Sequence, residues 1–262
     1  MTRSTIHTAA KGAALPKRLL RQRICDLRLS LDASPLRACV DELYSELTEA
    51  GFIHFRPTIY LGDEWFSPDG VPAISMPFYL ANRELMALER DQLKFVEGES
   101  TEECMQLLRH EAGHCFDHAW KISSRSDFRR VFGTSKTTRY TPDRYRADST
   151  SRDFVRHLPD NYAQSHPDED FAETFAVWLA PKSRWQSAYA NWPGALRKLE
   201  YVDQLVHSLA PSKPIVTSGP TTFAAHRLTR TLAAHYRRRR HEVARERRGT
   251  LGTKETQLTS NR

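Results

Sequence analysis

The segment that most constrains the fold lies between residues 100 and 120, where a capping signal and a helical repeat coincide. Ser100 can cap a helix, and Glu103 stands three residues later, as in a capping box. Apolar residues then recur at helical spacing, at Cys104, Leu107, Leu108, Ala112 and Cys115. The pattern predicts one helix with an apolar stripe along one side.

The same helix carries the sequence His110-Glu111-Ala112-Gly113-His114. Residues four apart share a helix face, so both imidazoles can reach one ion, while Glu111 is offset enough to meet a water on that ion without binding it. Zinc with three protein ligands keeps an open position, lowers the pKa of its water to about 7 and polarises a carbonyl group. Glu111 would take the water's proton as general base and return it to the leaving amine.

A third ligand is expected from the stretch Asp168-Glu169-Asp170-Phe171-Ala172-Glu173, in a helix that opens near Ser165 and ends at Pro181. Glu169 and Glu173 share one face, so one can bind zinc while the other accepts the free ring N–H of a zinc-binding histidine. An alternative is that the acidic first turn only complements the helix dipole. That alternative leaves Glu173 unexplained, because Glu173 falls in the helix interior beside phenylalanines.

Two further side chains near the motif are candidate ligands on position alone. Cys115 directly follows His114, but adjacent helical residues point about 100° apart. His118 lies four residues beyond His114, yet a third imidazole in line along one helix diverges from a tetrahedral site. We therefore expect a buried thiol at Cys115 and a surface or supporting role for His118. Gly113 is a poor helix former, which a helix interior tolerates best for a packing reason.

Composition indicates an ordinary globular chain. Of 262 residues, 39% are hydrophobic and 27% charged. No apolar run approaches the length of a membrane span, the N-terminus lacks the apolar core of a secretory signal, and the four cysteines form no CxxC pair, so we expect a cytoplasmic location. The basic, Thr-rich N-terminus also has the composition of a transit peptide, which leaves targeting open. The other elements predicted are a strand at 27–31, a helix from an N-cap at Ser34 to Gly51, strands at 52–61 and 71–80, and helices at 82–94 and 185–209.

The net charge of +7 is concentrated near the C-terminus, where nine arginines lie between residues 226 and 248. Leu228, Leu232 and Tyr236 recur at spacing four before the run Arg237–Arg240, which predicts an amphipathic basic helix. This helix would either dock on the body or bind a polyanion such as nucleic acid or an acidic surface. The expected division is a basic flexible tail at 1–23, a catalytic domain at 24–209, a linker at 210–222, the basic helix at 223–248 and a disordered tail at 249–262.

Residues 24–209 resemble the gluzincin metallopeptidases, and within them the bacterial family of putative zinc-binding metallopeptidases. The resemblance includes Asp63-Glu64-Trp65, Met76-Pro77-Phe78-Tyr79-Leu80, the HExxH motif and the stretch Tyr162 to Leu179. The spacing from Tyr162 to Glu169-Asp170-Phe171-Ala172-Glu173 is similar to that of the anthrax lethal factor catalytic domain and of glucose-regulated cytosolic metallopeptidases. The resemblance implies that Glu169 binds the zinc ion and that Tyr162 faces it and steadies the transition state.

The fold implied by the resemblance is α+β and zincin-like: a small twisted sheet packed on the HExxH helix, an edge strand that pairs with substrate, and a helical C-terminal half. The function expected is a zinc-dependent metallopeptidase with one Zn²⁺ per chain, acting on a peptide or a flexible protein segment. The alternative is a zinc-binding regulatory or interaction protein whose Arg-rich helix contacts a polyanion. Glu111 discriminates between them, because a purely structural site needs no general base and usually has four protein ligands.

Overall fold

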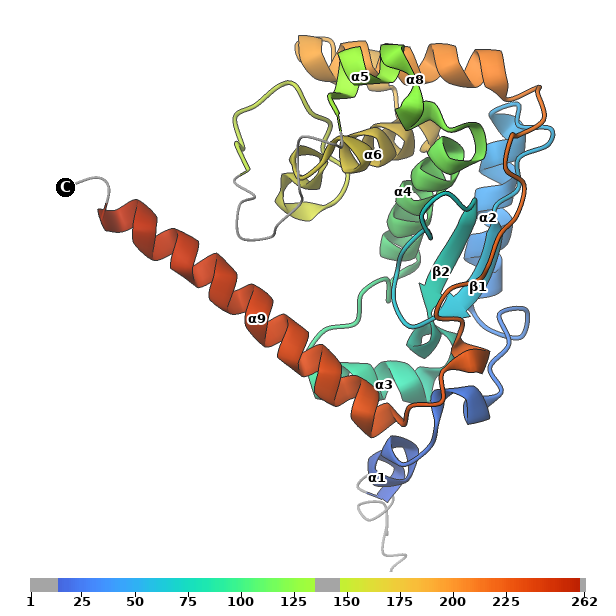
Figure 1. The fold of residues 1–262 in the computed structure, drawn as a ribbon, viewed down its shortest axis with the longest axis vertical. Helices are drawn as coiled ribbons and strands as arrows, with labels where there is room; N and C mark the ends of the chain where they lie inside the picture. Colours follow the sequence, from blue (N-terminus) through green and yellow to red (C-terminus); the bar gives the residue numbers. More distant parts are fainter. Residues whose placement is uncertain (1–13, 135–146, 260–262) are drawn as a thin grey trace, which may run out of the picture.

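The computed structural model describes residues 14–134 and 147–259, with side chains from Lys17 to Arg245 outside the internal gap. This part of the chain is mostly helical with one two-stranded sheet (Figure 1), which confirms the predicted α+β class. Its α-helices and strands are α1 (Ala14–Leu20), α2 (Leu36–Glu49), β1 (Thr58–Gly62), β2 (Ala73–Pro77), α3 (Arg83–Leu93), α4 (Thr101–Trp120), α5 (Ser126–Phe132), α6 (Pro167–Leu179), α7 (Trp185–Ala188), α8 (Pro193–Leu209) and α9 (Leu232–Thr259). Short 3₁₀ segments are η1 (Ile24–Leu27), η2 (Phe78–Ala81), η3 (Ile122–Ser124), η5 (Pro159–Gln164) and η6 (Ala225–Arg227).

Helix α4 is the centre of the molecule and begins where its capping signal predicts. The Ser100 hydroxyl accepts the backbone N–H of Glu103 at 3.1 Å. The helix packs closely on α6 (Figure 1), and a Cβ atom at Gly113 would lie 2.7 Å from Ala172 Cα. Glycine is therefore required at this position because a side chain would push α6 away from α4, so the predicted packing reason is confirmed.

The sheet consists of two parallel strands, β1 and β2, with Thr58 paired to Ala73. The connection at 63–72 passes to the far edge of β2, where Ser75 N–H donates to the Phe66 carbonyl at 2.9 Å. Strand β2 is wholly buried and packs on α4. The strands predicted at 52–61 and 71–80 are present but shorter, because residues 78–81 turn into η2 and the aromatic residues before β1 enter the core without strand pairing.

Two local predictions near the N-terminus are wrong. No strand forms at 27–31, because the preceding residues pair with the distant C-terminal segment: Ile24 N–H donates to Arg230 O, and Cys25 N–H donates to Leu228 O. Ser34 does not cap α2 with its side chain; its hydroxyl donates to Leu31 O at 2.7 Å, and the helix begins at Leu36. Both differences arise from hydrogen bonds that periodicity and residue preference do not encode.

The segment 210–222, expected to be a linker, contacts the body along its length. Ile215 and Val216 both donate their N–H groups to the carbonyl of Ala119 at the end of α4. The Tyr60 hydroxyl on β1 donates to Thr222 O. Figure 1 shows this segment descending beside the sheet from α8 towards α9. The proposed domain division remains a prediction, but these contacts tie the C-terminal part of the chain to the sheet and to α4.

Helix α9 docks on α3 through its first two turns and then extends away from the body (Figure 1). Leu232 and Tyr236 are fully buried in the core cluster that includes residues of α4. The helix starts later than residue 223 and runs past residue 248 to Thr259. Residues 1–13 and 260–262 of the predicted tails lie outside the described part of the chain.

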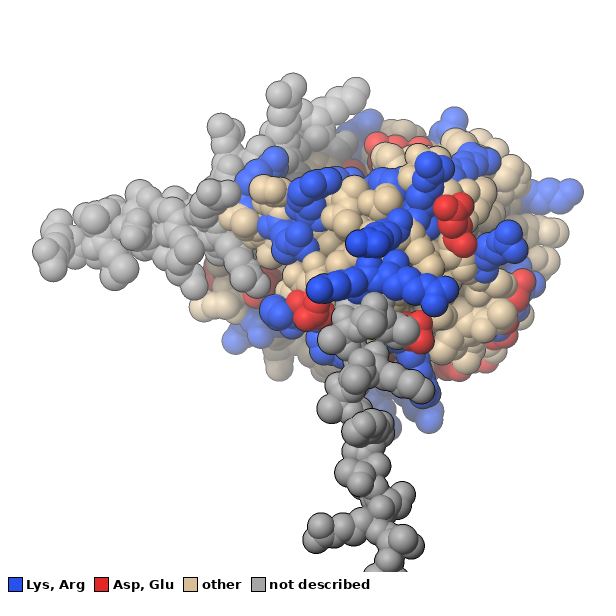
Figure 2. Space-filling model, turned by 90° about the horizontal axis from the view of Figure 1, so that it is seen from below, with Lys and Arg blue, Asp and Glu red and all other residues tan. Residues whose placement is uncertain are grey.

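Several arginines near the start of α9 form ion pairs with carboxylates that follow β1. Arg230 lies 2.6 Å and Arg238 lies 3.3 Å from the buried Asp63 carboxylate. Arg238 and Arg239 also lie 3.0 and 3.2 Å from Glu64. Lys and Arg side chains are spread over the face of the molecule seen from below (Figure 2). The ion pairs agree with the docking alternative, and binding of a polyanion at Arg237–Arg240 remains a prediction.

Candidate metal centre

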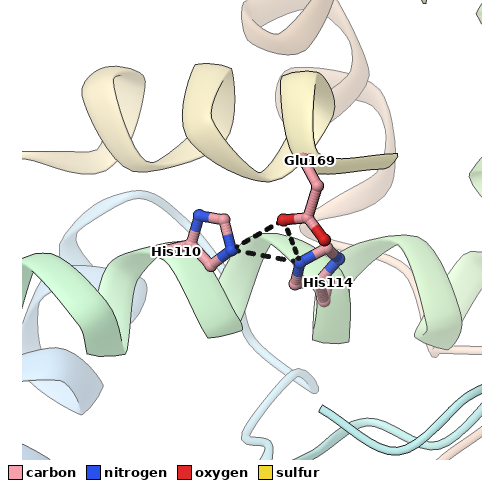
Figure 3. Close-up of side chains that lie close together, drawn as sticks. All are labelled: His110, His114 and Glu169. Carbon is pink, nitrogen blue, oxygen red and sulfur yellow. Dashed lines mark hydrogen bonds and ion pairs between the residues drawn. The ribbon is translucent and has the colours of Figure 1, made fainter. Parts of the chain in front are cut away.

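Two helices bring the predicted ligands together. His110 and His114 project from one face of α4, and Glu169 projects toward them from the first turn of α6 (Figure 3). His110 Nε2 lies 3.1 Å from Glu169 Oε2, and His114 Nε2 lies 3.2 Å from both His110 Nε2 and Glu169 Oε2. Among the described residues these three form the one group of His, Cys, Asp or Glu side chains spaced to hold a metal ion.

The spacing of these three atoms suits zinc. Ligands 2.0 to 2.1 Å from a tetrahedral ion lie about 3.3 to 3.4 Å from one another. The three observed separations of 3.1 to 3.2 Å are close to that value. Two neutral imidazole nitrogens and one carboxylate oxygen also form a donor set typical of catalytic zinc, which leaves a fourth position open.

Glu173 fixes the orientation of His110 from one turn further along α6. His110 Nδ1 lies 2.9 Å from Glu173 Oε1, so the ring donates its N–H to this carboxylate and presents the lone pair of Nε2 to the metal position. The second oxygen of Glu173 accepts the backbone N–H of Leu158 at 2.8 Å. Because Glu173 is fully buried and both oxygens are bonded, its geometry suits a supporting carboxylate, as the sequence predicts.

The three predicted ligand side chains also stabilise the charged forms of one another. Burial opposes the charged form of His110, but hydrogen bonds to Glu169 and Glu173 outweigh it and raise the pKa to about 10. Burial likewise opposes ionisation of Glu169, yet the two histidines lower its pKa far below the ordinary value. A buried cluster so arranged favours cations at the histidine nitrogens, which is the preference of a metal site.

Glu111 lies in the same buried region, and one of its carboxylate oxygens has no partner among the described residues. Glu111 is 6% exposed, and its Oε2 atom has no hydrogen bond to any described residue. Burial raises its pKa, while His110 and His114 act in the opposite direction. A carboxylate oxygen without a hydrogen bond beside a metal position is suited to accept a proton from water there.

Tyr162 lies beside His110, at one end of the predicted ligand cluster, and His118 lies beside His114, at the other end. Tyr162 lies in η5, and its ring centroid is 5.8 Å from that of His110. Asp160 and Asn161 directly before it both adopt positive φ angles, of 60° and 56°, which turn the chain sharply at this point. The sequence predicts that Tyr162 faces the metal, and the hydroxyl's catalytic role remains a prediction.

A cavity of about 350 Å³ opens beside the three ligands. The sequence did not predict that the segment after β1 would form part of its wall. The cavity is lined by Trp65, Phe66, Ser67, Asp69, His110, Glu111, His114, Asp117, His118, Tyr162, His166, Asp168 and Glu169. In the sequence, the one indication that this segment belongs to the site was the motif Asp63-Glu64-Trp65, which is part of the family resemblance.

Cys115 and His118, which the sequence analysis did not expect to bind the metal, both contact the segment that follows β1. The Cys115 Sγ atom is fully buried and lies 3.4 Å from the Ser67 hydroxyl. His118 Nδ1 lies 3.2 Å from the Val71 carbonyl, to which it donates in the tautomer with a proton there. Neither is a member of the metal-binding group.

Asp170 and Lys198 form a buried ion pair that supports the metal-binding end of α6 and that the sequence gave no reason to expect. Lys198 Nζ on α8 lies 2.6 Å from Asp170 Oδ2 and donates to the Asp153 carbonyl. It also lies 3.9 Å from the centroid of the Phe154 ring. Burial raises the pKa of Asp170 to about 7, although Lys198 works against this. The pair fixes the residue next to Glu169 against α8.

Replacing Lys198 with methionine should destabilise the fold by about 3 to 5 kcal/mol, because it leaves a buried carboxyl without its cation. The folded-state pKa of Asp170 already exceeds its unfolded value, so the folded state binds the proton more tightly and stability falls as pH rises above about 4. Without Lys198, which holds this pKa down, the pKa of Asp170 should rise further. The loss of stability relative to the wild type should therefore grow with pH in urea titrations of the variant. A deficit independent of pH would show that packing, rather than the ion pair, is lost.

Comparison with known protein families finds one similarity. Residues 80–205 match the model of a family described as "Putative zinc-binding metallo-peptidase". This family is the one that the sequence resembles, and the matched stretch contains α4, α6 and all three residues of the metal-binding group. Searches of curated proteins and of solved structures each gave no match. No helix in the described part of the chain is long and apolar enough to cross a membrane.

Proposed function

We propose that this protein is a zinc-dependent metallopeptidase in which His110, His114 and Glu169 hold one Zn²⁺ and Glu111 is the general base. The observation that carries the proposal is that one cavity holds three candidate ligand atoms at tetrahedral spacing and a buried Glu111 oxygen that has no partner among the described residues. A structural zinc site would be closed by a fourth protein ligand, and the metal-binding group among the described residues has three members. This favours an enzyme over a binding or regulatory protein.

The residues of the chain divide the chemistry between them. When bound, zinc polarises the carbonyl of the scissile peptide bond and lowers the pKa of water to about 7. Glu111 takes the proton of the attacking water and delivers it to the leaving amine. Glu173 holds the His110 ring in place through the 2.9 Å hydrogen bond.

The substrate proposed is a peptide or a flexible protein segment in an extended conformation. The cavity wall formed by Trp65, Phe66 and Ser67 is the stretch that pairs with the outer edge of β2 through Phe66. An extended chain passing this wall would lie across the face of α4 that carries the two histidines. A cytoplasmic location remains the expectation from the sequence.

Replacing Tyr162 with phenylalanine should leave zinc affinity unchanged and slow turnover by roughly 10²-fold or more, if the hydroxyl stabilises the oxyanion that develops on the substrate. The ring and its contact with His110 are retained in this variant. Steady-state kinetics on one peptide, with zinc content measured in parallel, test the prediction. Full activity in Tyr162→Phe would remove the residue from the mechanism.

The experiment that tests the proposed function uses the full chain and a diverse peptide library. Zinc-loaded protein, chelator-treated protein and chelator-treated protein with zinc restored are each incubated with the library, and products are read by mass spectrometry. We expect cuts in the first and third samples and none in the second. If all three samples leave the library intact, the peptidase proposal fails and a binding role takes its place.

A further inference from the structure

The charged side chains that line the cavity are mainly acidic. Among the described residues, its wall contains five carboxylates, at Asp69, Glu111, Asp117, Asp168 and Glu169, and no lysine or arginine, although the chain carries a net charge of +7. Glu111 and Glu169 together offset the two positive charges of a zinc ion. The other three carboxylates are therefore in excess of what the metal requires.

The three excess carboxylates lie at the same end of the cavity, beyond His114. Asp117 belongs to the next turn of α4, beside His118. The segment that carries Asp69 reaches this turn, because the hydroxyl of Ser67, two residues before Asp69, lies 3.3 Å from His118 Nδ1. Asp168 comes from the start of α6, next to Glu169. Tyr162, by contrast, contacts His110 at the other end.

No cation in the described part of the chain neutralises Asp168. Its side chain is 34% exposed, but the Oδ1 atom itself is buried and has no hydrogen-bond partner there. Its Oδ2 atom lies 3.3 Å from His166 Nδ1, but that nitrogen accepts the backbone N–H of Asp168 at 3.2 Å and so has no proton to offer the carboxylate. A buried oxygen without a donor costs free energy unless a ligand or water supplies one.

The other two carboxylates also lack an ion-pair partner among the described residues. Asp117 is 7% exposed, and its Oδ1 atom accepts the backbone N–H of Ser123 at 2.6 Å, which leaves its charge in place. Asp69 is exposed in the loop between β1 and β2, where an entering side chain can reach it. The aromatic rings of Trp65 and Phe66 line the same cavity and offer a surface for an aliphatic stem.

We propose that this acidic end of the cavity binds a lysine or arginine side chain of the substrate, close to the scissile bond. The inference rests on the proposed function and specifies its substrate class. A cationic side chain supplies the missing donor to Asp168, and its charge is matched by Asp69 and Asp117. Its flexible hydrocarbon stem packs against the aromatic part of the wall. An acidic substrate side chain would meet three like charges at the same place.

The test uses three matched peptides that differ at one position near the scissile bond, with lysine, norleucine or glutamate. Norleucine keeps the length of the lysine stem without its charge. We expect kcat/KM to fall in the order lysine, norleucine, glutamate, with about 10-fold between lysine and norleucine for one charge pair near a protein surface. In Asp168→Asn and Asp69→Asn the ratio of lysine to norleucine should fall toward one, and most in the double variant. The matched control Asp91→Asn, an exposed position on α3 away from the cavity, should keep the wild-type ratio.

Binding without turnover supplies a second readout. The zinc-loaded Glu111→Gln variant is titrated with the same three peptides, and the lysine peptide should bind most tightly, with a preference that weakens as salt is added. Zinc content is measured in each variant, because Asp168 adjoins a proposed ligand. Cleavage of all three peptides at equal kcat/KM, or an unchanged lysine preference in the double variant, would overturn this inference and leave the peptidase proposal standing. Failure to cleave any peptide would overturn the peptidase proposal itself, and the titration would then decide whether the acidic end binds cations.

Discussion

Replacement of Glu169 by alanine should abolish tight zinc binding, because it removes one of three ligand atoms that lie within 3.2 Å of one another. Two histidines cannot complete a catalytic site, and the remaining positions would be left to water. Replacement of Glu173 by alanine removes only the carboxylate that orients His110. We expect that variant to bind zinc about 10 to 100-fold more weakly than the wild type.

Competition titrations with a zinc-binding dye measure both affinities, and Glu200→Ala on the exposed surface of α8 serves as the matched control. Circular dichroism on the metal-free proteins separates loss of ligands from loss of fold. Should Glu173→Ala prove unable to bind zinc while Glu169→Ala retains it, the two glutamates must exchange roles. That result would place the metal one turn further along α6.

Replacement of Glu111 by glutamine should lower turnover by about 10² to 10⁴-fold while zinc content and fold stay unchanged, because a positioned general base typically contributes that much. Glutamine matches the size of the buried side chain but accepts no proton at neutral pH.

The measurement is kcat on a single peptide at matched zinc occupancy for wild type and Glu111→Gln. Unchanged turnover would remove Glu111 from the mechanism. Loss of zinc from Glu111→Gln would instead identify Glu111 as a ligand, which its offset from the two histidines along α4 argues against. The two proteins share every other residue of the cavity, so the comparison isolates one proton-transfer group.

The predictions from sequence that the structure confirms are those whose cause is local. The cap at Ser100 and the run of α4 depend on residues within a few positions of each other. The need for glycine at position 113 follows from its unsuitability in a helix interior, and the structure supplies the reason in the approach of Ala172. That Glu169 and Glu173 share one face of α6 follows from their spacing of four residues.

The features that the sequence did not reveal depend on contacts between distant residues. The strand expected at 27–31 is absent because its neighbours pair with residues 228–230, which no periodicity can predict. The cavity wall at 65–69 and the Asp170–Lys198 pair likewise join segments far apart in the chain. Arg230, just before α9, and Arg238, in α9, form ion pairs with Asp63 and Glu64 after β1, and the charge pattern of the C-terminal segment did not suggest these partners.

Crystals of the zinc-loaded protein measured at the zinc absorption edge locate the metal without reference to activity. The structure predicts one anomalous peak per chain, about 2.0 to 2.2 Å from His110 Nε2, His114 Nε2 and a carboxylate oxygen of Glu169, with Glu111 beyond bonding distance. A peak that lacks any of these three ligands, or a site closed by a fourth protein side chain, would contradict the proposed catalytic centre.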